Sequence, residues 1–133
     1  MLGREPLLAE PAPTLPGFLI AHASQCASRL VGMPSFRAQL NIVGLRPGYR
    51  PEAVMDTAVA ALAERHHVEA NQLDIVAGIP RITLRFTVEE PERGAENRTA
   101  RESAALMRAA VEAVAVTQRL AVLRRVRGTW VAV

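Results

Sequence analysis

The order of two hydrophobic periodicities between residues 36 and 133 constrains the fold of this chain more than any other feature. Apolar residues alternate with polar ones where a strand is expected, and they recur every three to four residues where a helix is expected. The resulting order is strand, helix, strand, strand, helix, strand. This order is typical of the ferredoxin-like βαββαβ sandwich, in which two helices cover one face of a four-stranded antiparallel sheet. We therefore predict an α+β domain of this kind.

Turn and capping residues bound the expected elements. Pro51 and Glu52 suit the first turn of a helix, and the alternation of Ile82, Leu84 and Phe86 predicts the clearest strand. The expected strands cover residues 36–45, 72–77, 81–89 and 120–133, and the expected helices cover residues 51–66 and 98–119. The pattern leaves open whether the last strand is continuous or bends at Gly128.

An N-terminal extension precedes the predicted domain, which spans residues 36–133. Residues 1–16 contain four prolines and no periodicity, so we expect a flexible tail. Residues 17–35 are expected to form a short helix and a linker. The apolar side chains of that helix need a surface to cover, on this chain, on a second copy or on another protein. The candidate partner or dimer contacts are Phe18, Ile20, Leu30, Leu123 and Val131.

The sheet face opposite the helices carries the candidate binding residues. If Val122, Val126 and Trp130 point toward the helices, with Trp130 filling the core, the alternate positions of the last strand lie on the open face. The candidate residues on that face are Arg37, Gln39, Asn41, Arg81, Thr83, Arg85, Arg125, Arg127 and Thr129. Five of them are arginines, although all 16 basic residues of the chain are arginine, which also fits a coding bias.

Three interpretations of this face stay open. It is a solvated surface, a partner surface for a homodimer, or an anion-binding surface whose guanidinium groups meet phosphates. The RNA-recognition module uses the same face of the same fold, but it stacks bases on aromatic side chains, which the predicted face does not contain. Nucleic acid binding is therefore disfavoured, although contact with a phosphate backbone stays an alternative.

No arrangement of residues predicts catalysis, a metal site or a cofactor. His22 and Cys26 are spaced to share a helix face, but two ligands do not make a zinc site. His66 and His67 end the first predicted core helix, and no second group is evident that could exchange a proton with them. The chain has no glycine-rich phosphate loop and no nucleophile-elbow motif.

Composition narrows the setting. The formal net charge is +3 with 13 acidic residues against the 16 arginines, so no strong field directs the molecule toward nucleic acid. The single cysteine excludes an internal disulfide, and no apolar run is long enough to span a membrane. We expect a small cytoplasmic interaction or regulatory module that is non-enzymatic and homodimeric. An anion or nucleic-acid binder is the first alternative, and a small enzyme or ligand-binding domain is the second.

Overall fold

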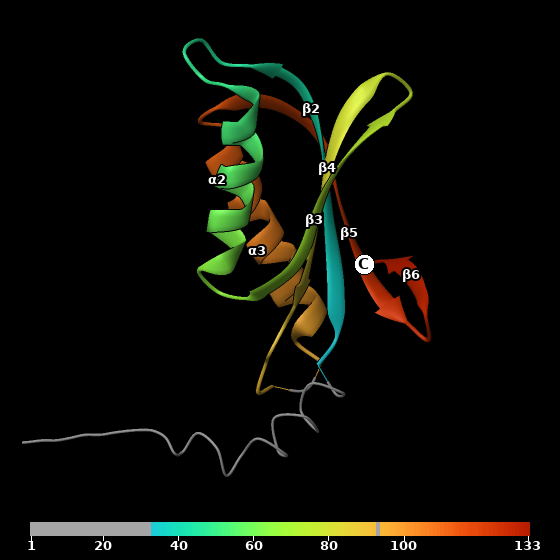
Figure 1. Cartoon of the computed structure of the whole chain (residues 1–133). Helices are drawn as coiled ribbons and strands as arrows, with labels where there is room; N and C mark the ends of the chain where they lie inside the picture. The colour runs from blue at the N-terminus through green and yellow to red at the C-terminus, as the bar shows by residue number, and fades with distance from the viewer. Residues whose placement is uncertain (1–32, 93) are drawn as a thin grey trace, which may run out of the picture. The chain divides into compact units, whose positions relative to one another are not determined.

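The computed structural model describes residues 33–92 and 94–133, and the part from Pro34 to Val133 forms one compact unit. Its elements follow one another as β2 (Ser35–Leu45), α2 (Pro51–Ala63), β3 (His67–Val76), β4 (Ile79–Thr87), α3 (Glu96–Val111), β5 (Ala115–Val126) and β6 (Thr129–Ala132). Figure 1 shows both helices on one face of the sheet. The predicted α+β class is confirmed for these residues. Phe18, Ile20, His22, Cys26 and Leu30 lie outside the described residues.

Within the described residues the sheet has five strands in the order β3-β4-β2-β5-β6, and every neighbouring pair is antiparallel. The prediction of four strands was wrong, because residues 120–133 contribute to two strands. A turn at Arg127 and Gly128, with φ angles of 52° and 81°, reverses the chain between β5 and β6. Two consecutive left-handed residues match the twist of a tight hairpin, and glycine adopts that conformation without strain.

The second helix is shorter than predicted, and the strand after it begins earlier. We expected a helix over residues 98–119, whereas α3 ends at Val111 and β5 starts at Ala115. Val114, Val116 and Thr117 are β-branched and fit a pleated sheet better than a helix. On α3, Leu106 is 49% exposed, while its neighbour Met107 is fully buried. The start of α2 at Pro51 agrees with the prediction.

The core lies between the sheet and the two helices. β2 is the central strand, with β4 on one side and β5 on the other. The Phe36 and Phe86 rings, on adjacent strands, stack with their centroids 6.0 Å apart. The largest fully buried side chains are Phe36, Leu40, Leu62, Leu84, Phe86, Val88, Met107 and Val111.

Two adjacent residues of α3 test this assignment of the core. Met107→Ala removes a fully buried side chain, so we expect the free energy of unfolding to fall by about 2–5 kcal/mol. Leu106→Ala is the matched control and should change it by less than about 1 kcal/mol, because Leu106 is half exposed. Urea unfolding followed by circular dichroism measures both. Equal losses in the two variants would contradict the orientation of α3.

Candidate functional site

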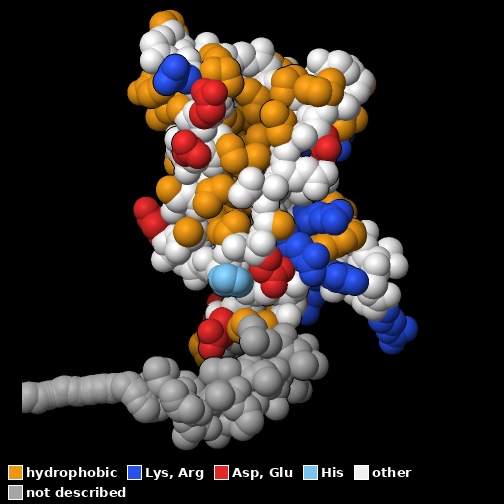
Figure 2. Space-filling view, in the orientation of Figure 1, with side chains coloured by type: hydrophobic (Ala, Val, Ile, Leu, Met, Phe, Trp, Pro, Cys, Tyr) orange, Lys and Arg blue, Asp and Glu red, His pale blue; other side chains and the backbone are white. Residues whose placement is uncertain are grey.

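Six of the predicted sheet-face residues lie together on the side away from the helices. The register pairs them across β2 and β4, as Arg37 with Arg85, Gln39 with Thr83, and Asn41 with Arg81. Their neighbours along each strand, such as Phe36 and Leu84, point into the core. Figure 2 shows arginine side chains gathered on this side of the sheet.

The turn between β5 and β6 places the remaining predicted residues differently. Leu123 lies opposite Arg37 in the ladder and shares its face, as Arg125 does two residues later. Arg127 lies in the turn itself. Thr129 pairs with Val126, and Val131 pairs with Arg124. Contrary to the prediction, neither lies on the open face. The hairpin reverses the chain, and the alternation expected for one continuous strand therefore fails after Val126.

Trp130 lies on the open face, and the prediction that it fills the core was wrong. It pairs with Arg125 across the hairpin, and the guanidinium carbon of Arg37 lies 4.2 Å from its ring centroid. The guanidinium carbon of Arg85 lies 5.5 Å from the same centroid. Cation–π attraction explains why two arginines stand side by side here, since like charges directly opposite each other in a ladder otherwise repel.

Other groups on this face also have partners within the chain. Arg85 Nε lies 3.0 Å from Glu69 Oε1, but it is buried and makes no hydrogen bond, so the contact is electrostatic. Arg81 Nε donates a hydrogen bond to Asn41 Oδ1 over 3.1 Å. The three arginines of β2 and β4 on this face, Arg37, Arg81 and Arg85, therefore interact with the protein itself. This arrangement weakens the case for a free anion-binding surface.

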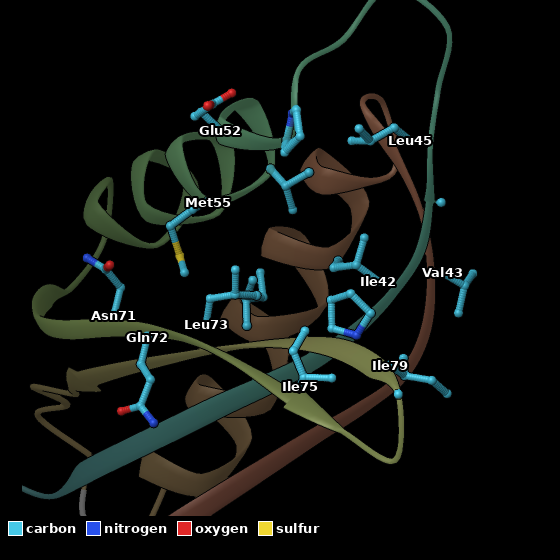
Figure 3. Close-up of a pocket in the computed structure, with 16 residues that line it drawn as sticks. Ile42, Val43, Leu45, Glu52, Met55, Asn71, Gln72, Leu73, Ile75 and Ile79 are labelled. Atoms are coloured by element: carbon cyan, nitrogen blue, oxygen red, sulfur yellow. The ribbon is translucent and has the colours of Figure 1, made fainter.

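A second surface, which the sequence did not predict, is a cleft between α2 and the β3–β4 hairpin. Its volume is about 1030 Å³, and apolar side chains dominate its lining. In Figure 3, Met55 of α2 and Leu73 of β3 point toward one another, whereas Gln72 points to the other side of β3. The apolar lining comes mainly from Ile42, Val54, Met55, Leu73, Ile75 and Ile79. We call this surface the apolar cleft.

The apolar cleft adjoins an unpaired strand edge. β3 is the outermost strand on its side of the sheet and pairs only with β4 in the described part of the chain. Leu73 and Ile75 lie opposite Ile82 and Pro80 and face the helix layer, yet they are 61% and 65% exposed. The alternation of Leu73 and Ile75 around Asp74 indicates in the sequence that both side chains share a face. It does not indicate that α2 leaves both of them exposed.

Among the described residues, His66 and Ser103 form a pair of the kind found in catalytic sites. His66 Nε2 lies 2.7 Å from Ser103 Oγ, and its ring packs on Phe86 at a centroid distance of 5.3 Å. Ser103 is only 3% exposed, and no carboxylate contacts His66 among the described residues. The pair joins the chain after α2 to α3, which is a structural role.

The described residues contain no group of three or more side chains suited to holding a metal ion. The suggested pair of His22 and Cys26 lies outside them. None of the helices described is both long enough and apolar enough to cross a membrane.

The environment of His66 predicts how stability depends on pH. Burial, and then the nearby Arg65 guanidinium, lower the pKa of His66 from its ordinary value of 6.5. The folded protein therefore binds this proton less readily than the unfolded chain does. The contribution is complete above the unfolded pKa and is lost as the pH falls from there through the lowered folded pKa. We expect the melting temperature to fall between about pH 7 and about pH 5.

Two variants isolate this effect. His66→Gln should flatten the pH dependence, because glutamine does not titrate, whereas a change of the exposed neighbour, His67→Gln, should leave it intact. Glu112 adds to the pH dependence of stability at lower pH than His66 does. A hydrogen bond from Thr117 and then one from Arg108 lower the pKa of Glu112 from its ordinary value of 4.5. Retention of the full slope in His66→Gln, in thermal scans at each pH, would contradict the assignment.

A double-mutant cycle tests the contact between Arg37 and Trp130. We expect Trp130→Leu to lower the free energy of unfolding by about 1–2 kcal/mol, since it removes the aromatic ring that offsets repulsion between two arginines. Combined with Arg37→Gln, the cycle should give a coupling energy of about 0.5–1 kcal/mol. The control cycle replaces Trp130→Leu with Val126→Ala and should be additive. Additivity in both cycles would show that the ring does not interact with Arg37.

No protein-family model, curated protein or solved structure matches this chain. Two surfaces of the described residues are candidates for function. One is the open sheet face with its arginines, and the other is the apolar cleft beside the edge of β3 that pairs with no other described strand.

Proposed function

We propose that this protein is a small, non-enzymatic interaction module that binds an extended polypeptide segment through the apolar cleft and the free edge of β3. The observation that carries the proposal is the exposure of Leu73 and Ile75, at 61% and 65%, on an edge strand beside a cleft of about 1030 Å³. A bound strand would use both features at once.

The chemistry of strand addition fits this surface. An edge strand offers backbone N–H and C=O groups that a second strand can pair with, and adjoining pockets select alternate side chains of that strand. β3 is 10 residues long, and Leu73, Ile75 and Val76 on it are exposed. An edge strand that exposes apolar side chains can pair with a further strand. A partner strand would cover those side chains.

Other parts of the proposal follow from the expectations about fold and setting. The inner strand order β5-β2-β4-β3 supports a ferredoxin-like core to which β6 is an addition. The single cysteine supports a reducing compartment such as the cytoplasm. The open sheet face and the N-terminal residues stay proposed as further contact surfaces, and the module is proposed to act as a homodimer.

The alternative is an anion or nucleic-acid binder. The position of Trp130 next to the exposed residues Arg125 and Arg127 supports it, because an aromatic ring can stack on a base while guanidinium groups contact phosphates. The partners of Arg37 and Arg85 count against it, since binding would have to displace them. The enzyme alternative has little support, because His66 contacts a buried serine and no acid among the described residues.

Selection from a library of random ten-residue peptides, displayed against the immobilised protein, tests the proposed function. The enriched peptides should alternate apolar and polar residues, because only every second side chain of a bound strand reaches the apolar cleft. Ile75→Asp should weaken their binding at least about tenfold, which corresponds to about 1.4 kcal/mol.

The matched control is Leu106→Asp, which places the same charge at an exposed apolar position on α3 and should leave peptide binding unchanged. Peptides that bind both variants as well as the original protein would show that the apolar cleft is not the binding surface.

A further inference from the structure

We infer that β3 pairs with β3 of a second copy of this chain. The two strands are antiparallel, and the two-fold axis passes midway between the two copies of Leu73. This inference rests on the proposed function and names its partner. It follows from the geometry of β3 and from the charges along it.

Only part of β3 is regular enough to pair with a further strand. The register between β3 and β4 shifts between Val68 and Ala70, where one strand carries an extra residue. Such a bulge twists the strand and ends regular pairing. The regular part of β3 therefore runs from Ala70 to Val76, and its midpoint is Leu73. Symmetric pairing of the largest regular length places the axis there.

The two faces of the sheet limit how two copies of β3 can pair. A two-fold axis perpendicular to the sheet keeps both helix layers on the same side, so residues directly opposite each other must share a face. Leu73 and Ile75 face the helix layer, whereas Gln72 and Asp74 lie opposite Thr83 and Arg81 on the open side. With the axis at Leu73, each leucine meets its own equivalent. The two apolar clefts then become neighbours across the new strand pair.

The polar side chains of β3 favour an axis at Leu73 over an axis at either neighbouring residue. With the axis at Leu73, Asp74 lies opposite Gln72 of the second copy, which can donate a hydrogen bond to it. Gln72 Nε2 already donates to Asp74 Oδ2 over 2.7 Å within one copy, so the two groups are suited to each other. An axis at Asp74 would place two carboxylates face to face, which destabilises a ladder. An axis at Gln72 would place Ile75 opposite Glu69 of the second copy.

A cysteine at the axis tests the register in the full-length chain. In a Cys26→Ser background, Leu73→Cys should form an intermolecular disulfide readily under mild oxidation, because opposed residues of an antiparallel pair have Cα atoms within the range that a disulfide spans. Ala70→Cys, on the same strand, is the matched control. Its opposite residue in the second copy is Val76, so it should crosslink at least about tenfold more slowly.

Light scattering after size-exclusion chromatography tests the dimer itself. The original chain should show about twice its mass of 14.4 kDa. Leu73→Asp should weaken dimerisation at least about tenfold, since it places two carboxylates opposite each other. Leu73 is 61% exposed, so the variant should keep its fold, which circular dichroism checks. Leu106→Asp should stay dimeric.

Each remaining outcome overturns the inference. Equal crosslinking at residues 70 and 73 would indicate another register, and a dimer that survives Leu73→Asp would indicate another surface. A monomer without crosslinking at residue 73 would exclude the second copy. In that case, peptides that still depend on Ile75 would leave the proposed function standing with a foreign strand as the partner. If no such peptides bind either, the proposed function is contradicted together with the inference.

Discussion

The pairing of β2 with β4 and β5 is the interaction on which the rest of this structure depends. It brings Phe36 and Phe86 onto adjacent strands, where both are fully buried and their rings stack. Aromatic and aliphatic side chains aligned in this way remove a large apolar area from water and fix the register, because a slip by one residue would turn every core side chain to the other face. This register also sets which side chains of β2, β4 and β5 face the core and which lie on the open face.

The helix layer covers the sheet unevenly, and that unevenness creates the apolar cleft. α2 buries Val54, Ala58 and Leu62, and α3 buries Met107 and Val111, all of them in the core. β3 extends past the part of the sheet that α2 covers, so Leu73 and Ile75 stay in contact with solvent. An apolar groove beside an unpaired strand edge is a surface suited to a further strand, and this combination distinguishes it from an ordinary exposed patch.

The arginines of the open sheet face have partners within the protein, which the charge pattern of the sequence does not reveal. Arg37 and Arg85 face each other in the ladder, and Trp130 and Glu69 offset the resulting repulsion. Arg81 also has a partner on this face, because its Nε donates a hydrogen bond to Asn41 Oδ1. Arginine is well suited to such contacts, because its planar group stacks on aromatic rings and stays charged. The cluster contributes to holding β6 onto the sheet, in addition to any role in binding.

Local patterns in the sequence are enough to predict the α+β class, the start of α2 and the faces of β2 and β4, because unbroken alternation and the position of a proline are local signals. Alternation also predicted that Arg37, Arg81 and Arg85 share the open face, whereas their partners across the strands come from the register. The position of Trp130 depends instead on the tertiary structure, because the turn at Arg127 and Gly128 reverses the chain and ends the alternation on which the prediction relied. The exposure of Leu73 and Ile75 depends on how far α2 reaches over β3, which is a distance between elements that no local pattern encodes.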